Sequence, residues 1–125
     1  MKQTLMLLAI LVGLVCHAQQ NPEQNDVTVE VVTFRLKPGI TPEEGQKKLL
    51  QLNEHVMHFE GFIERNLTVS EDGEWADIVH WTSLSHALNA AEQVAKNPEA
   101  LAFFSVIDES TIAMHHYSLV HKFNK

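Results

Sequence analysis

The segment FIERNLTVSEDGEWADIVHWT, residues 62 to 82, places two stretches rich in β-branched and aromatic residues on either side of the tetrapeptide EDGE. Asp-Gly is typical of the tight turns that join antiparallel strands. The segment therefore predicts a β-hairpin with strands at residues 62 to 70 and 75 to 82. The second strand is mostly apolar but contains Asp77 and His80, which raises the question of which surfaces these two side chains serve.

Residues 27 to 36, VTVEVVTFRL, predict a strand that precedes the hairpin, since β-branched residues dominate them. Strand alternation places Val29 and Val31 on one face and Glu30 and Phe34 on the other. Both faces are largely apolar, as in a strand that is covered on two sides.

Between this strand and the hairpin lies a strong helix-start signal. Thr41 is suited to the N-cap, Pro42 to the first helical position, and Glu44 completes a capping box. Four apolar residues follow at helical spacing: Leu49, Leu52, Val56 and Phe59. The segment therefore predicts one helix over residues 41 to 60, which Gly61 ends.

The chain after the hairpin predicts two more helices and a last strand. Apolar residues recur at helical spacing from residue 83 to residue 96, and Asn97-Pro98 then ends this second main helix. Pro98 suits the first position of a short third helix, which would hold Leu101, Phe104 and Ile107. Residues 111 to 123, TIAMHHYSLVHKF, alternate as a fourth strand.

These elements follow one another in the order β-α-β-β-α-β. The predicted fold class is α+β, a ferredoxin-like four-stranded antiparallel sheet with both main helices on one face. The first and third strands are central in such a sheet. Because the first strand is apolar on both faces, a second copy packing sheet to sheet is the simplest cover for the face without helices. The sequence therefore predicts a homodimer that forms a dimeric α/β barrel.

The first 18 residues have the layout of a secretory signal peptide. Lys2 precedes an apolar run over residues 5 to 15, which is shorter than the roughly 20 residues of a membrane-spanning helix. We expect cleavage after residue 18, export to the periplasm or the exterior, and no membrane insertion of the remainder. Residues 19 to 26 predict a flexible tether, and residues 27 to 125 a single folded domain.

Cys16 offers an alternative to simple export, namely lipidation of its side chain. Bacterial lipoproteins carry a small residue before the modified cysteine, whereas Val15 precedes it here. Cys16 is also the only cysteine of the chain, so the cleaved protein has neither disulfides nor thiolate chemistry. The domain must be stabilised by packing alone.

The charge balance argues against polyanionic partners. Without Lys2 the chain carries 8 basic and 16 acidic side chains, and no cluster of lysine and arginine offsets this excess. Nucleic acids and anionic membrane surfaces require basic patches. The sequence therefore predicts no nucleic-acid partner.

Four segments spread over residues 27 to 123 form a family pattern: VVTFRLKPGITPEE, FEGFIERNL, EDGEWADIVHWTSLSHALNA and NPEALAFFSVID. Together they resemble the antibiotic biosynthesis monooxygenase (ABM) group of dimeric α/β-barrel proteins. That superfamily includes cofactor-independent oxygenases of aromatic polyketides, haem-degrading enzymes and members without a known reaction. The resemblance therefore implies the fold and the dimer, and it suggests a cofactor-independent monooxygenase that acts on a small aromatic or apolar molecule.

The haem-degrading branch resembles a narrower pattern, with Asn in the first strand, Trp at the end of the third and His in the helix before the fourth. Trp81 fits the second position, but Phe34 stands at the first, and the helix near Phe104 and Ser105 has no histidine. Haem degradation by that arrangement is therefore not expected. The chain also has no glycine-rich strand-to-helix motif for a flavin or nucleotide, so we expect no cofactor.

The candidate catalytic residues are His116, His80 and Asp77. His80 is either a general base or a neutral histidine in the core or an interface. Asp77 must be paired or reach solvent, because burial of a lone charge is very costly. Alternation places Asp77 and His80 on opposite faces, one beside a cavity on the helix side and the other at the interface between sheets. No histidine spacing supports a metal site, so none is predicted.

The candidate substrate-binding residues are Trp81, Phe34, Arg35, Phe59 and Phe104. The aromatic ones either line a pocket or belong to the core. Arg35 either pairs with Asp77 or a bound anion, or forms a surface salt bridge. Two functional hypotheses remain open: a monooxygenase in which one polar residue removes a substrate proton, and a non-enzymatic dimeric module that binds a small ligand or serves a stress response.

Overall fold

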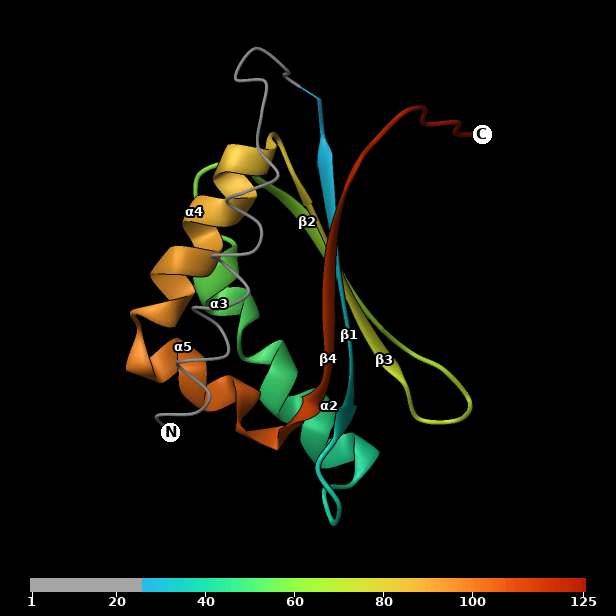
Figure 1. The fold of residues 1–125 in the computed structure, drawn as a ribbon, viewed down its shortest axis with the longest axis vertical. Helices are drawn as coiled ribbons and strands as arrows, with labels where there is room; N and C mark the ends of the chain where they lie inside the picture. Colours follow the sequence, from blue (N-terminus) through green and yellow to red (C-terminus); the bar gives the residue numbers. More distant parts are fainter. Residues whose placement is uncertain (1–25) are drawn as a thin grey trace.

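The computed structural model describes residues 26–125, in which all helices cover one face of a single four-stranded sheet (Figure 1). The elements are β1 (Thr28–Leu36), α2 (Pro42–Leu50), α3 (Asn53–Val56), β2 (Phe62–Val69), β3 (Trp75–Trp81), α4 (Leu84–Ala95), α5 (Pro98–Ala102), the 3-10 helix η1 (Phe103–Val106) and β4 (Ile107–Ser118). The predicted ferredoxin-like α+β fold is confirmed. The predicted signal peptide and nearly all of the predicted tether lie outside the described residues.

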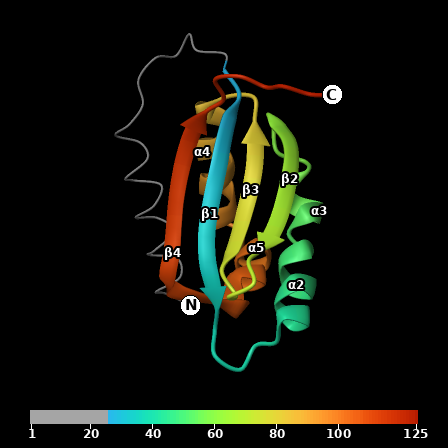
Figure 2. The ribbon, with the colours of Figure 1, turned by 90° about the vertical axis from the view of Figure 1, so that its right-hand side faces the viewer.

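The strands are ordered β2-β3-β1-β4 and all pairs are antiparallel, so β1 lies between β3 and β4 (Figure 2). Glu30 in β1 therefore stands opposite Val79 on one side and His116 on the other. The β1 and β4 ladder contains a register shift between Thr33 and Arg35. This shift is a β-bulge, and it changes which β4 side chains face the helices.

Strand alternation separates the two faces of the sheet as predicted. Along β3, every second residue from Trp75 to Trp81 is buried, and the residues between them are half-buried. Asp77 is on the buried face toward the helices, whereas His80 is on the opposite face. No helix covers that opposite face in the described part of the chain (Figures 1 and 2).

The prediction of one continuous helix over residues 41 to 60 is wrong. Thr41 and Glu44 do form the predicted capping box at the start of α2, but α2 ends at Leu50 and the one-turn helix α3 follows. The Nη1 of Arg65 donates a hydrogen bond of 2.9 Å to the main-chain oxygen of Leu49. This long-range contact satisfies a carbonyl at the end of α2, and it depends on a residue that lies 16 positions away.

The last strand differs from its prediction at both ends. It begins at Ile107, four residues earlier than expected, and it ends at Ser118. It begins early because its ladder with β1 continues past the bulge to Leu36 and Ile107. It ends early because β1 begins at Thr28, which pairs with Ser118; beyond that pair, Leu119 N still donates to the main-chain oxygen of Val27. Ile107 therefore belongs to the strand and not to the predicted third helix.

The core lies between the sheet and the helices and consists of two apolar clusters. One cluster joins α3, α4 and β3 around Trp81, Val79 and Leu52. The other joins α2, β1 and η1 around Phe34 and Leu49, with Phe34 stacked on Trp75. Phe104 packs against both clusters. No helix among the described residues has the length and apolar character needed to cross a bilayer.

We predict that Gly61→Ala lowers the free energy of unfolding by about 1–3 kcal/mol or more. Gly61 has a φ of +86°, and an added Cβ would lie 2.4 and 2.5 Å from the Cγ and Cβ atoms of His86. Gly39→Ala is the matched control, because Gly39 has a φ of +90° but open space around it. Urea denaturation should show the larger loss for Gly61→Ala, and equal losses would contradict the close packing on His86.

Candidate functional site

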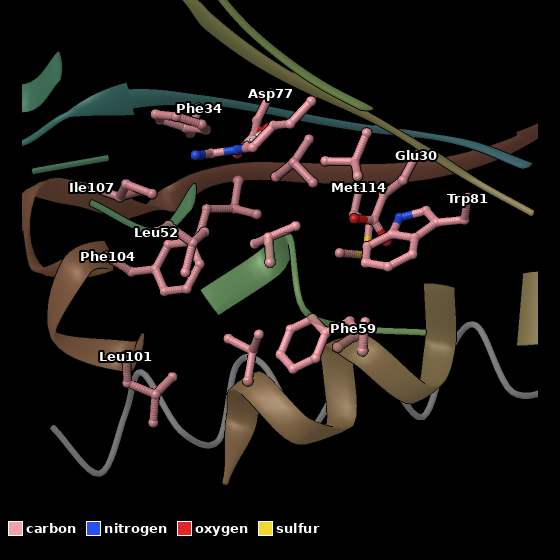
Figure 3. Close-up of a pocket in the computed structure, with 18 of the residues that line it drawn as sticks. Glu30, Phe34, Leu52, Phe59, Asp77, Trp81, Leu101, Phe104, Ile107 and Met114 are labelled. Carbon is pink, nitrogen blue, oxygen red and sulfur yellow. Dashed lines mark hydrogen bonds and ion pairs between the residues drawn. The ribbon is translucent and has the colours of Figure 1, made fainter. Parts of the chain in front are cut away.

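A cavity of about 110 Å³ lies between the sheet and the helices, lined mainly by apolar side chains (Figure 3). All four strands contribute to one wall, β2 through Arg65 alone, and α3, α4, α5 and η1 contribute the other. Four predicted substrate-binding residues line it: Trp81, Phe34, Phe59 and Phe104. The polar lining is confined to a few side chains, as in many small-molecule sites.

The first polar feature is a buried carboxylate and imidazole pair. Glu30 lines the cavity from β1, and its Oε2 lies 2.7 Å from the Nε2 of His116 on β4. The two side chains are only 11% and 9% exposed. The imidazole N–H donates to the carboxylate, so the pair is held by the register that places these residues opposite each other. Of the predicted catalytic residues, His116 therefore reaches the cavity through Glu30.

The second polar feature is the indole N–H of Trp81. Trp81 is 3% exposed and lines the cavity. Its Nε1 has no hydrogen-bond partner among residues 26–125. Figure 3 shows this nitrogen on the side of the ring that faces Glu30. A buried N–H without an acceptor costs free energy, so this donor is available to a bound molecule.

The third polar feature is the ion pair of Arg65 and Asp77, with side chains 3% and 11% exposed. The Nη2 of Arg65 lies 2.7 Å from Oδ2 of Asp77, and its Nε lies 2.9 Å from Oδ1. Arg65 also donates through Nη1 to Leu49 O and to Asn53 Oδ1, at 2.9 and 2.8 Å. Asp77 is therefore paired as its burial requires, and both of its oxygens are engaged by one guanidinium.

Arg35 does not line the cavity. Its guanidinium donates to the main-chain oxygen of Asp72 and lies 3.1 Å from the Asp72 carboxylate, in the turn between β2 and β3. Hydrogen bonds from Ser70 and from Arg35 hold the pKa of Asp72 below its ordinary value. Arg35 thus forms the surface salt bridge, and the alternative that it pairs with Asp77 is wrong.

His80 lies outside the cavity as well. Its Nδ1 is 3.2 Å from Oε1 of Glu64 on the neighbouring strand β2. This pair occupies the face of the sheet that carries no helix. In the described part of the chain, no three His, Cys, Asp or Glu side chains converge as a metal site requires.

Glu30 and Arg65 were not predicted as site residues from the sequence. For Glu30 a signal was present, because alternation places it on the face of Phe34, where a carboxylate in an apolar row calls for a partner. For Arg65 the sequence offers no comparable signal. Its partners lie 12 and 16 positions away, and only the folded sheet brings them together.

We predict that Arg65→Leu lowers the free energy of unfolding by about 3–5 kcal/mol, because it leaves the carboxylate of Asp77 buried without a counter-charge. The double variant Arg65→Leu, Asp77→Leu should recover part of this loss. Arg35→Leu, which removes an exposed pair, serves as the control and should leave stability almost unchanged. Chemical denaturation measures all three, and equal effects of the two single variants would contradict the role assigned to Arg65.

No protein-family model and no curated protein matches the sequence. Solved structures do match. A putative antibiotic biosynthesis monooxygenase from Bordetella bronchiseptica superimposes with a TM-score of 0.66 at 17% identity, over 77% of this chain and 99% of that one. SnoaB, a cofactor-independent oxygenase from Streptomyces nogalater, gives a TM-score of 0.65 at 18% identity, over 80% and 99%.

A third match is the monooxygenase ActVA-Orf6 of Streptomyces coelicolor, solved in complex with the ligand nanaomycin D. It has a TM-score of 0.57 and 22% identity, over 81% of this chain and 94% of that chain. At such identities the comparisons establish the fold and do not establish the reaction. The resemblance seen in the sequence thus extends to the backbone, and this chain has the fold of the antibiotic biosynthesis monooxygenase-type proteins.

Proposed function

We propose that this protein is a cofactor-independent oxygenase that acts on a small apolar molecule bound between the sheet and the helices. The observation that carries the proposal is the buried pair of Glu30 and His116 on the wall of an otherwise apolar cavity. A carboxylate there can take a proton from a bound molecule while bulk water is excluded. The names of SnoaB and ActVA-Orf6, an oxygenase and a monooxygenase, support the same class of reaction.

In the proposed reaction, Glu30 takes a proton from the substrate and leaves an electron-rich anion. The anion transfers one electron to dioxygen, which gives superoxide and a substrate radical. These combine into a peroxide anion, which takes back a proton from the Glu30 and His116 pair. Loss of water from the hydroperoxide leaves a carbonyl group on the substrate, so one oxygen atom enters the product and the other leaves as water.

The structure favours Glu30 over the other candidate bases. Both oxygens of Asp77 accept hydrogen bonds from Arg65, so a proton taken up by Asp77 would disrupt a buried ion pair. His80 belongs to the opposite face of the sheet. His116 does not line the cavity but donates a hydrogen bond to Glu30. We therefore assign it a positioning role.

The alternative is a module that binds the same kind of molecule without converting it. The observation that favours it is the closed ion pair of Arg65 and Asp77, which stabilises the cavity wall and offers little to a reaction. Binding requires the apolar walls and the free N–H of Trp81, but it does not require a base. The two functions therefore differ in what Glu30 contributes.

We predict oxygen uptake with at least one member of a panel of single-ring phenols and hydroquinones, above the rate of their autoxidation. Glu30→Gln should slow this uptake about 10²–10⁴-fold, as expected for loss of a general base. Glu64→Gln removes the carboxylate of a similar pair outside the cavity, with His80, and should leave the rate unchanged. An oxygen electrode measures these rates.

A second measurement decides between the two functions. NMR titration of the same panel shows which compounds bind in the cavity. Binding without oxygen uptake by any bound compound would overturn the oxygenase and leave the binding module.

We also propose that the face of the sheet without helices packs against a second copy of the chain. The central residues of this face include Val29, Val31 and Ile78, which are half-buried by their strand neighbours alone. Such an apolar sheet face is costly to leave in water. The predicted mass in solution is therefore twice the 14.1 kDa of the chain before processing, less the mass of any removed leader.

Ile78→Asp should convert this dimer into a monomer, because each of the two copies would then place one negative charge in the centre of the contact. Glu109→Gln, on the cavity side of β4, is the control and should leave the dimer intact. Light scattering coupled to size-exclusion chromatography measures both masses. A wild-type protein that is monomeric at micromolar concentration would contradict the proposal.

A further inference from the structure

The cavity has one polar end at which a free donor and a carboxylate lie together. The Nε1–H of Trp81 has no acceptor among the described residues, and the Glu30 carboxylate, which is bound to His116 through Oε2, can accept a further hydrogen bond. We infer that this end binds a hydroxyl group, and that the ligand is a neutral single-ring phenol. This inference deepens the proposed function, on which it rests, by naming the class of substrate.

The strand register places the donor and the carboxylate within reach of one ligand atom. Glu30 pairs with Val79, and Trp81 lies two residues further along β3 on the same face. Such diagonal neighbours are about 7–8 Å apart at Cα, a separation that long and aromatic side chains span. Figure 3 shows the indole nitrogen and the Glu30 carboxylate turned toward the same part of the cavity.

A hydroxyl is the group that satisfies both partners at once. Its oxygen accepts from Trp81, and its hydrogen is donated to Glu30. A carbonyl or an ether has no hydrogen to donate to the carboxylate, and an ammonium group has no lone pair for the indole N–H. A carboxylate ligand would meet the negative charge of Glu30, which costs free energy in a buried site.

The size and the walls of the cavity decide what carries the hydroxyl. An engineered cavity of about 150 Å³ holds benzene, whereas this one encloses about 110 Å³. One ring therefore fills it after small movements of flexible side chains such as Met114, and two fused rings do not fit. Around the ring most of the walls are aromatic and aliphatic. Of the other polar lining residues, Arg65 and Asp77 are paired with each other, and Glu109 also has a partner. No second polar group is needed on the ligand.

The test compares the binding of phenol, anisole, toluene and 1-naphthol to the purified protein by NMR titration. We expect phenol to bind about tenfold more tightly than anisole or toluene, the effect of a net hydrogen-bond gain in a buried site, and 1-naphthol more weakly than phenol. In Trp81→Phe the preference for phenol over toluene should fall to about threefold or less. Toluene reports the change in packing, so the ratio isolates the N–H.

Trp75→Phe is the matched control, because Trp75 is a buried tryptophan of the same strand that does not line the cavity. The preference for phenol should survive in this variant. Equal affinities of phenol and toluene for the wild-type protein, or a preference unaffected by Trp81→Phe, would overturn the inference. A preference for phenol without any oxygen uptake would support the inference and overturn the oxygenase. Oxygen uptake with anisole or toluene but not with phenol would do the reverse.

Discussion

The buried guanidinium of Arg65 is the contact on which the shape of the site depends. It joins β2 to β3 through Asp77, and it joins both strands to the end of α2 and the start of α3 through Leu49 and Asn53. A cation with 3% exposure is costly to bury, and its several hydrogen bonds offset that cost. Because this one side chain holds the helical layer at a set distance from the sheet, the space between them can remain partly open.

The cavity wall contains two buried carboxylates, Asp77 and Glu30, which differ in how fully their oxygens are hydrogen-bonded. Asp77 is bound at both oxygens by one rigid partner, while Glu30 shares one oxygen with His116. Both face the helices from neighbouring central strands, so the fold alone does not distinguish them. The difference arises from the cross-strand partner: an arginine fork encloses a carboxylate, whereas an imidazole leaves part of it accessible. The structural role of Asp77 and the reactive role proposed for Glu30 therefore follow from their partners and not from their positions.

Local sequence patterns predicted the parts of this fold that depend on local chemistry. The capping box at Thr41, the Asp-Gly hairpin and the alternation that separates Asp77 from His80 all follow from neighbouring residues. What could not be predicted depends on register. The break after α2 and the partner of Asp77 both involve Arg65, and the pairing of Glu30 with His116 joins residues 86 positions apart. The aromatic candidates line the cavity because alternation and helical spacing fix the face on which a side chain lies.

The bulge in β4 has a consequence for how this chain tolerates changes of length. Between the pairs Thr33 with Ala113 and Arg35 with Asp108, β4 holds three more residues than β1 requires. This odd excess lets Glu109 and Met114 both line the cavity although their numbers differ in parity. One additional residue that the bulge did not absorb would slip the following part of β4 by one position and bring His115 opposite Glu30. An imidazole would still face the carboxylate of Glu30. The two consecutive histidines, His115 and His116, would therefore preserve this contact after a single insertion at the register shift of β4.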